Sequence, residues 1–520
     1  MGFADRFPHL AKASVFLAAI LILYTLAQKL VQFRSRAALK QATGAQSARH
    51  YPQWDRVYGF DMFRDAMTAF REHRMLRRST ERFQISGLST YEIVVLGRSM
   101  VMTQEPQNLK VIQALEHKKW GLGERRKTSF KPLLGDGIFT NDGADWAHSR
   151  EMLRPNFVRS QVGDVKTFER HVAHLLSKLP KDGSTVNLAD YFFRLTMDSA
   201  TEFLFGESTD SLTRDSEEGF AAAFNRSQEF IAMRARFGFW VRWFPFLFGE
   251  SDSTKDQEFV HKFVDYYVEK GCAKRDQMRG QKQSEEKSDR YIFIDELVSQ
   301  TNDRTRIRSE LLNILLAGRD TTASLLTNVW WTLSKRPDLW AKIQAEVATL
   351  DGAHPTFEQL KELKFVRALL NESLRLYPVV PQNSRQAQED TTLPVGGGPD
   401  GTSPLFVPKG QVVGWTVYGM HRRQDFYGAD AEEFRPERWL DDPATGKKGL
   451  RPGWEYLPFN GGARICLGQQ FALTEASYTT VRLCQAFSGI ESRDPVDVWQ
   501  ESIALTCVNL EGAKVGLTAR

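Results

Sequence analysis

The sequence predicts a mainly α-helical protein with small β-sheets, an α+β class, preceded by one N-terminal transmembrane helix. Three observations support this prediction. A long apolar segment lies near the N-terminus, and apolar residues recur at three- and four-residue spacing from about 144 to 350. After Val380 the chain changes to short strand-like stretches rich in Gly and Pro. The 520 residues, 42% of them apolar and 12% aromatic, are enough to bury a large core.

The N-terminal segment ASVFLAAILILYTLA, residues 13–27, approaches the length of a bilayer span. Residues 25–27 also fit a small-residue cleavage site, so a cleaved signal peptide is the competing interpretation. Positive charge after the segment favours a retained anchor with the main body on the cytoplasmic side. The basic residues that follow are Lys29, Arg34, Arg36 and Lys40. We expect a membrane anchor over 1–33, a polar tether over 34–55 and a globular domain over 56–520.

Local signals predict the elements of the first half. YEIVVL at 91–96 and SMVMT at 99–103 flank Gly97-Arg98, which predicts a hairpin with a two-residue turn that starts at glycine. The region 144–350 is then expected to be overwhelmingly helical. A polar connector, GQKQSEEKSDR at 280–290, interrupts it.

The second half begins with a long apolar helix, expected from about Arg308 to Lys335, and Pro337 is expected to start the next helix. Thr356 and Gln359 have the spacing of a capping box. A final helix is expected just after Gly468. The overall expectation is a helical body with small sheets toward both ends.

Charge and cysteine usage exclude several classes of protein. The chain has 69 Lys and Arg against 64 Asp and Glu, a formal charge of +5, with no dense basic block, so no nucleic-acid partner is expected. The cysteines form no disulfide framework or zinc-finger spacing, which fits a reducing, cytosol-facing compartment. They are Cys272, Cys466, Cys484 and Cys507.

Two histidines provide the one alternative metal site. His171 and His174 lie three residues apart and could reach one zinc ion from a single helix face. No third histidine or acidic partner is nearby in the sequence. We therefore interpret this stretch as a solvated helix face.

The stretch LPFNGGARICLGQQFALTE, residues 457–475, has an unusual cysteine environment. Glycines allow sharp backbone curvature, and a helix expected after Gly468 would favour negative charge at its N-terminus. A thiolate requires such stabilisation or a metal. The spacing F-x-x-G-x-R-x-C-x-G predicts a site for a flat, anionic, iron-bearing ligand. Its members are Phe459, Gly462, Arg464, Cys466 and Gly468.

This stretch resembles the haem-binding loop of the cytochrome P450 family. The resemblance implies the cytochrome P450 fold, haem b (iron-protoporphyrin IX) as cofactor and Cys466 as the axial ligand of the iron. It also implies O2, a hydrophobic small-molecule substrate and a separate NADPH–cytochrome P450 reductase, with cytochrome b5 as an additional candidate donor. Nothing in this chain resembles a nucleotide- or flavin-binding domain, so NADPH is expected to act only through that reductase.

A second resemblance lies in LLNILLAGRDTTASLL, where Ala317 to Thr322 match the family element A-G-x-D-T-T. Gly318 is unfavourable in a helix interior, and a buried Asp320 needs a partner or a use. Thr321 can hydrogen-bond to a carbonyl one turn earlier. The resemblance implies Asp320 and Thr321 as catalytic residues that relay protons. A helix with one polar face is the alternative for this segment alone.

Further matches concern cofactor binding. Trp146 and Arg150 lie four apart, as on one side of a helix, and without the resemblance they would be a surface cation–π pair. The resemblance implies that these two residues and Arg385 bind the haem propionates. Arg464 is expected to pair with an anionic group of the same ligand.

Glu372 and Arg375 share a helix face, and such a pair is usually a solvated ion pair. In this family E-x-x-R is instead buried and completed by an arginine, here Arg438. The implied role is structural, holding the haem loop in shape. Trp439 replaces the family's usual phenylalanine.

The segment from Gly121 to Phe157 resembles the fungal branch that hydroxylates n-alkanes and fatty acids. HYPQWD, residues 50–55, departs from the proline-rich hinge common in membrane-bound relatives, which weakens the substrate prediction. We expect a monooxygenase of the endoplasmic reticulum membrane, with a single-pass anchor and a cytoplasmic catalytic domain, that hydroxylates unactivated C–H bonds of an aliphatic substrate. The alternatives are a tailoring monooxygenase for polyketide- or terpene-derived intermediates of secondary metabolism, a non-oxidative haem-thiolate isomerase or dehydratase, and a haem sensor.

Three segments are expected to form the substrate walls, and Phe139 is a further candidate. The segments are the turn Leu315–Ala317, the segment Val379–Gln382 and the turn Leu505–Val508. The reductase is expected to dock beside Cys466, where surface Arg or Lys would assist.

Overall fold

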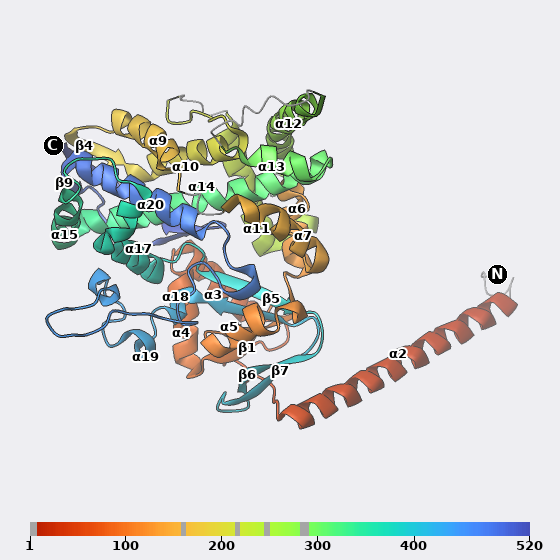
Figure 1. Ribbon diagram of the computed structural model, residues 1–520. Coiled ribbons are helices and arrows are strands. Elements are labelled where there is room, and N and C mark those ends of the chain that lie inside the picture. The colour runs from red at the N-terminus through yellow and green to blue at the C-terminus, as the bar shows by residue number, and fades with distance from the viewer. Residues whose placement is uncertain (1–7, 158–162, 214–218, 244–249, 281–290) are drawn as a thin grey trace.

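The computed structural model describes residues 8–157, 163–213, 219–243, 250–280 and 291–520. Most helices gather in one part of the body, the larger sheet and its short helices lie beside them, and one helix projects away (Figure 1). The predicted helical α+β class is confirmed. The connector predicted at 280–290 lies, apart from Gly280, outside the described residues.

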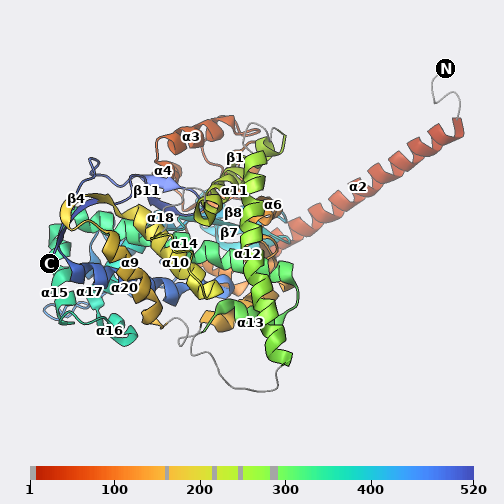
Figure 2. The same cartoon turned by 90° about the horizontal axis from the view of Figure 1, so that it is seen from above.

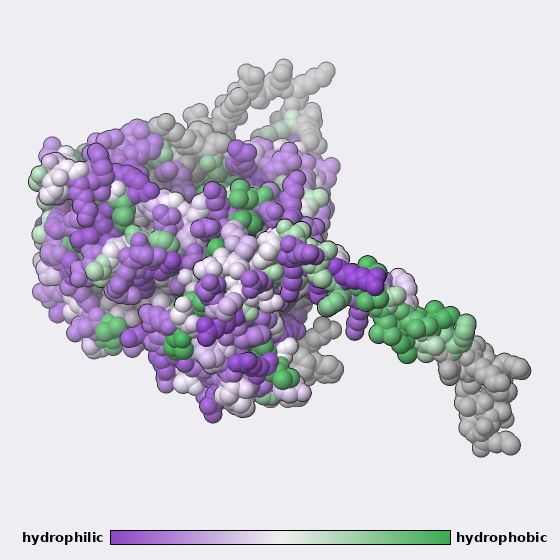
Figure 3. Space-filling model, turned by 90° about the horizontal axis from the view of Figure 1, so that it is seen from below, coloured by the Kyte–Doolittle hydropathy of each residue, from purple (hydrophilic) through white to green (hydrophobic). Residues whose placement is uncertain are grey.

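The projecting helix α2 (Pro8–Thr43) contains the predicted anchor. Its part from Phe16 is long and apolar enough to cross a membrane and is not buried by the rest of the chain. Figure 3 shows its apolar surface standing out from a largely hydrophilic body. The helix continues to Thr43, within the segment predicted as a tether, and Arg36 there forms a 2.9 Å ion pair with Asp390. The division into anchor, tether and domain remains a prediction.

The predicted hairpin is present, but its turn lies one residue earlier than expected. Strands β1 (Thr90–Val95) and β2 (Arg98–Thr103) are antiparallel, with Val95 opposite Arg98. The turn is therefore Leu96-Gly97, at φ 50° and 72°, rather than Gly97-Arg98. Two-residue hairpin turns favour a positive φ at both turn residues. Leu96 therefore adopts a left-handed backbone conformation, which is unfavourable for a residue with a side chain.

The larger sheet has five strands in the order β1-β2-β8-β5-β3. Its other strands are β8 (Val412–Thr416), β5 (Gln382–Ala387) and β3 (Trp120–Gly121). Strands β2 and β8 pair in parallel, whereas the other neighbours are antiparallel. Beside this sheet lie α3 (Phe60–Arg71), α4 (Met75–Ser86) and the hairpin of β6 (Thr391–Gly397) and β7 (Ser403–Val407) (Figure 1). The sheet joins segments that are about 300 residues apart, which no local pattern specifies.

Helix α14 (Arg304–Lys335) runs through the helical part, and most of its residues from Ile307 onward are buried (Figures 1 and 2). The predicted long helix is confirmed, as is the next helix, α15 (Pro337–Ala348). Thr356 and Gln359 form both hydrogen bonds of the predicted capping box. The predicted final helix, α20 (Gln469–Ala486), follows Gly468 and packs against α14.

The remaining elements complete the helical body and two small sheets. The other α-helices are α5 (Pro106–Lys110), α6 (Glu124–Leu134), α7 (Gly143–Leu153), α9 (Val165–Lys178), α10 (Leu188–Phe205), α11 (Phe220–Trp243), α12 (Glu250–Gly280), α13 (Phe293–Gln300), α16 (Phe357–Glu362), α17 (Lys364–Leu376), α18 (Val417–Met420) and α19 (Gln424–Tyr427). The short turns of helix are η1 (Val111–Leu115), η2 (His117–Lys119), η3 (Arg154–Phe157), η5 (Pro436–Trp439) and η6 (Gly462–Arg464). The small sheets contain β4 (Asp182–Asn187), β9 (Phe487–Ser492), β10 (Glu501–Ile503), β11 (Cys507–Asn509) and β12 (Lys514–Ala519).

Strand β4 interrupts the region expected to be overwhelmingly helical. It pairs with β12, at the other end of the chain, and β12 also pairs with β9. The residues of β4 therefore become a strand because a distant partner supplies their hydrogen bonds.

Candidate active site

The loop around Cys466 is a tight turn held by backbone hydrogen bonds. The N–H of Cys466 donates to the carbonyl of Phe459 at 3.0 Å. Gly462 has φ +61°, and a Cβ there would lie 2.1 Å from the carbonyl oxygen of Gln113. The N–H of Gly461 donates to Oε1 of Gln113 at 2.9 Å. The predicted need for glycine is thus real at Gly462, where η1 packs directly against the loop.

Cys466 is a free thiol whose side chain is exposed, whereas the other three cysteines are free and buried. Surrounding protein nevertheless raises the pKa of the Cys466 thiol by desolvation, while the N–H of Gly468 and the charge of Arg150 oppose that rise. Unlike the other three thiols, the Cys466 side chain is therefore accessible to a ligand.

Three of the predicted cofactor-binding side chains gather beside this loop. The guanidinium of Arg464 lies 4.3 Å from the ring centroid of Trp146, and that of Arg150 lies 5.9 Å from the same centroid. Arg150 also donates to the carbonyl of Ile465 at 3.0 Å. Helix α7 therefore presents Trp146 and Arg150 to the residues just before Cys466.

The fourth, Arg385 on β5, is buried, and sequence reasoning missed a further arginine near it. Arg385 and Arg126 each donate to Oδ1 of Asn383 at 3.1 Å. Burial lowers the pKa of Arg385 well below its usual value, and repulsion from Arg126 and Arg464 lowers it further. Arg126 lies within the segment 121–157 that resembles the fungal hydroxylases, which could have drawn attention to it. No local pattern distinguishes it from the neighbouring basic residues.

The charges of this cluster are unbalanced. Asp142 accepts from Arg464 at 2.7 Å, and its other oxygen lies 3.0 Å from Nζ of Lys127. That single carboxylate faces the guanidinium groups of Arg126, Arg385 and Arg464. The Nε of Arg126 is buried without a hydrogen-bond partner among the described residues. Buried cations require anions as partners, and the two carboxylates of haem would supply them to this cluster. Cys466 lies beside the cluster, where its sulfur could ligate the iron.

Glu372 lies at the centre of a buried hydrogen-bond network. Arg375 donates to both of its carboxylate oxygens, at 2.8 and 2.9 Å, and Arg438 donates to Oε1 at 2.9 Å. Trp439 donates from its indole Nε1 to Oε2 at 2.9 Å. The expected buried triad is present, and Trp439, which departs from the family pattern, adds a donor that phenylalanine lacks.

On α14, the pair expected to relay protons has defined partners. Asp320 is buried, which raises its pKa, and the guanidinium of Arg319 at 2.7 Å partly opposes that rise. The hydroxyl of Thr321 donates to the carbonyl of Ala317 at 2.7 Å, as expected. The α-helix continues without a break through both residues and through Gly318.

Glu475, on α20, is a buried carboxyl that sequence reasoning did not single out. The hydroxyl of Ser199 on α10 donates to it, and Thr322 on α14 lies close enough to lower its pKa. Burial outweighs both effects and raises the pKa of Glu475 to about 8. The neutral acid is therefore the form that the folded protein stabilises.

Glu475→Gln should remove a pH dependence of stability. An unfolded glutamate has a pKa near 4.3. The folded protein therefore holds this proton between about pH 4.3 and pH 8, and its stability falls as pH rises through that range. In thermal unfolding, the Gln variant should lack this pH-dependent decline in the free energy of unfolding. The decline amounts to about 3–5 kcal/mol. The exposed Glu362→Gln is the matched control, and an unchanged pH profile in the Glu475 variant would contradict the assignment.

Hydrogen bonds link parts of the predicted substrate wall to α14 and to one another. The N–H of Phe139 donates to Asn313 on α14 at 3.0 Å. The N–H of Cys507 donates to the carbonyl of Val379 at 2.9 Å, which joins the second and third segments. Phe139, Leu316 and Leu505 are partly buried and pack against the same apolar core. The arrangement provides apolar side chains near α14.

The prediction of a solvated helix face at His171 is wrong. His171 is buried, and its Nε2 contacts the carboxylate of Glu202 on α10. Helix α9 packs this face against α10, a contact that its own sequence does not reveal. Within the described residues, no group of three or more His, Cys, Asp and Glu side chains is placed to hold a metal ion.

The fold and the site together define a haem-thiolate oxidoreductase. The family model for cytochrome P450 matches residues 66–509. The chain belongs to the cytochrome P450 family, whose members bind haem through a cysteine thiolate and act as monooxygenases with electrons that a reductase supplies from NADPH.

Three relatives illustrate the match. Cytochrome P450 monooxygenase himC of Aspergillus japonicus is 46% identical over 478 residues, covering 91% of this chain and 84% of that protein. Cytochrome P450 52A12 of Debaryomyces hansenii is 43% identical over 483 residues, covering 89% and 90%. Cytochrome P450 52A3-B of Candida maltosa is 45% identical over 444 residues, covering 82% of each chain.

Proposed function

We propose that this monooxygenase hydroxylates unactivated C–H bonds of a fatty acid or alkane while anchored to the endoplasmic reticulum membrane by α2. The observation that supports the substrate class is that Phe139, Leu316 and Leu505 are partly buried apolar side chains packed against one apolar core that includes residues of α14. The resemblance of residues 121–157 to the fungal n-alkane and fatty-acid hydroxylases supports the same class. A separate NADPH–cytochrome P450 reductase is proposed to dock beside Cys466.

The contacts around Cys466 support the proposed haem-binding residues. Cys466 ligates the iron, and the cations beside it hold the propionates, assisted by the indole N–H of Trp146. These cations are Arg126, Arg150, Arg385 and Arg464. Bound haem supplies the activation of O2 with electrons that originate from NADPH. The protein's contribution is to orient the substrate and to control access of water and protons.

Proton control is assigned to Asp320 and Thr321. Burial raises the pKa of Asp320, and the ion pair with Arg319 opposes that rise. A carboxyl with a raised pKa can take up a proton and release it to a neighbouring oxygen. Asp320→Asn removes that capacity with little change in volume. We expect kcat to fall by about a hundredfold, as for loss of a general acid. An unchanged kcat with intact substrate affinity would contradict the assignment. Asn313→Asp, on the same helix, does not serve as a control because Asn313 accepts a hydrogen bond from the N–H of Phe139.

Two arginines favour a fatty acid over an alkane. Arg125 on α6 donates to the carbonyl of Arg236, and Arg236 on α11 donates to the carbonyl of Ala504 at 3.2 Å. Burial lowers the pKa of both guanidinium groups. Within the described part of the chain, neither has a carboxylate hydrogen-bond partner. A substrate carboxylate would supply one, next to β10 and near the wall residue Leu505.

Arg125→Gln combined with Arg236→Gln should therefore raise KM for lauric acid by at least about tenfold, the value of one charge-assisted hydrogen bond. A long alkane has no carboxylate, so its KM should not change. Equal losses for the acid and the alkane would show that the arginines only support the structure.

The test of the proposed function is the difference spectrum of the reduced, carbon-monoxide-bound full chain, preceded by titration with lauric acid, a long alkane and polyketides. A thiolate-type Soret band with a spin-state shift for the aliphatic ligands is the expected result. The same band with a shift for polyketides alone would favour the tailoring monooxygenase. Haem-loaded protein that forms no product with reductase and NADPH would favour the isomerase or the sensor.

A further inference from the structure

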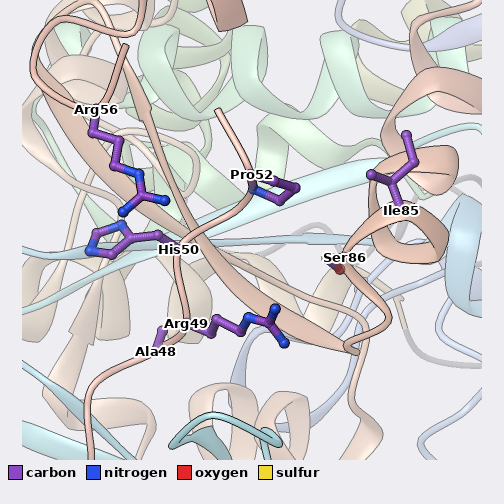
Figure 4. A pocket seen from close by; sticks show the side chains of 7 residues that line it. All are labelled: Ala48, Arg49, His50, Pro52, Arg56, Ile85 and Ser86. Atoms are coloured by element: carbon purple, nitrogen blue, oxygen red, sulfur yellow. The ribbon is translucent and has the colours of Figure 1, made fainter. Parts of the chain in front are cut away.

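A cavity of about 400 Å³ lies beside the start of α3 and the end of α4. Its lining residues are Ala48, Arg49, His50, Pro52, Arg56, Ile85 and Ser86. Figure 4 shows the guanidinium of Arg56 next to the ring of His50, and the side chain of Arg49 extending toward Ser86. Three basic side chains therefore surround one space.

The cavity has little negative charge to balance them. Among the described residues, no carboxylate lines it. Arg56 is exposed and has no ion pair or hydrogen bond with another described residue, and Arg49 donates only to the carbonyl of Pro399, at a long 3.5 Å. The nearby Glu92 has an oxygen 3.6 Å from Nε2 of His50. The chemistry of the cavity is that of an anion site with more than one donor, as phosphate requires.

Beside these cations, the chain presents apolar side chains to solvent from an ordered turn. The carboxylate of Asp55 accepts backbone N–H groups of Val57, Tyr58 and Phe60 at 3.2, 2.9 and 3.0 Å. The side chains that this turn leaves exposed are Trp54 (79%), Val57 (69%), Tyr58 (60%) and Phe60 (56%), with Ile85 (53%) at the cavity. Exposed apolar patches mark interaction sites, and aromatic rings beside cations are typical of membrane interfaces.

The cavity is also close along the chain to the helix proposed to span the membrane. Helix α2 ends at Thr43, and Gln46, Ala48 and His50 then form β-bridges with Leu405, Gly397 and Glu92. The path from the anchor to Arg49 is therefore short and fixed by pairing to the body. A bilayer that holds α2 is the phosphate-bearing surface that these residues would meet first.

We propose that Arg49, His50 and Arg56 bind the phosphate of an anionic membrane phospholipid, while Trp54, Tyr58 and Phe60 enter the interfacial layer. This site holds the body against the bilayer in one orientation. The inference rests on the proposed membrane anchoring by α2 and not on the identity of the substrate.

The first test uses the full, haem-loaded chain in a neutral detergent, titrated with short-chain phosphatidic acid and followed by native mass spectrometry. We expect one phosphatidic acid to bind, and Arg49→Gln combined with Arg56→Gln to weaken it by at least about tenfold. The single Arg56→Gln variant should show part of that loss. Lys447→Gln with Lys448→Gln removes two exposed cations outside the cavity and should have no effect.

Two further arms identify the source of the phosphate. Phosphatidylcholine of the same chain length should bind more weakly than phosphatidic acid, and inorganic phosphate should not displace the lipid at equal concentration. Phosphate binding as tight as that of the lipid would overturn the lipid assignment, and equal phosphatidic acid binding by the double variant would overturn the site. Arg49, His50 and Arg56 are not among the proposed haem-binding residues, so their substitution should leave the reduced carbon-monoxide spectrum unchanged. That spectrum therefore separates failure of the lipid site from failure of the monooxygenase proposal.

The aromatic residues have their own test in nanodiscs. Lipids brominated in the acyl chain quench nearby tryptophan fluorescence, and the difference between the native chain and Trp54→Phe isolates Trp54. We expect that difference signal to be quenched by brominated lipids. A Trp54 signal insensitive to them would place the turn outside the bilayer and contradict its role.

Discussion

Cys466→Ser should abolish monooxygenase turnover and the thiolate-type Soret band of the reduced, carbon-monoxide-bound protein. A serine hydroxyl has the size of the thiol but not its affinity for iron or its electron donation. The loop itself should survive, because its shape depends on the N–H of residue 466, Gly462 and Gln113 rather than on the sulfur atom. The measurements are the difference spectrum, the haem content and product formation with reductase.

The matched control is Cys272→Ala, which removes another free cysteine that is buried in the helical body. That variant should keep the thiolate spectrum and turnover. A native spectrum in the Cys466→Ser protein, or loss of the spectrum in the Cys272→Ala protein at full haem content, would mean that another cysteine ligates the iron.

Glu372→Ala should destabilise the protein by about 3–5 kcal/mol, because it leaves the guanidinium groups of Arg375 and Arg438 buried without their carboxylate. Arg438 keeps a contact of 3.4 Å to the carboxylate of Asp430. The backbone carbonyls of His421 and Tyr427, which accept from Arg375 and Arg438, carry no compensating charge. We expect a protein that loses haem readily or does not accumulate folded. Urea unfolding followed by the Soret band measures the change.

Trp439→Phe gives a graded version of the same test, since it removes only one donor to Glu372. A hydrogen bond to a charged group contributes about 1.5–3 kcal/mol, so the loss should be smaller than for Glu372→Ala. Asp338→Asn, in the exposed pair with Arg336, should cost under about 1 kcal/mol. Equal effects of the buried and exposed variants would refute the structural role of the network.

The cysteine loop and the helices around it were predictable because their signals are local. The spacing of Phe459, Gly462 and Cys466 encodes a turn that its own backbone closes, and α14 and α15 follow from apolar periodicity and Pro337. The capping box at Thr356 is equally self-contained. The hairpin turn lies one residue earlier than predicted because the strand register, and not the glycine alone, decides which residues turn.

The unpredicted features all depend on partners far along the chain. Arg126 belongs to the cofactor cluster through Asn383, Glu475 is neutral because α10 and α14 enclose it, and His171 is buried against Glu202. None of these residues has an unusual local sequence.

The sequence by itself determined the family, the cysteine expected to hold the iron and the apolar anchor, because spacing along one element constrains geometry within that element. Only the tertiary structure decided which cations lack a counter-charge, both at the haem cluster around Arg385 and in the cavity of Arg49 and Arg56. The physical reason is that desolvation and charge balance are sums over all neighbours in space, and most of those neighbours are remote in the chain.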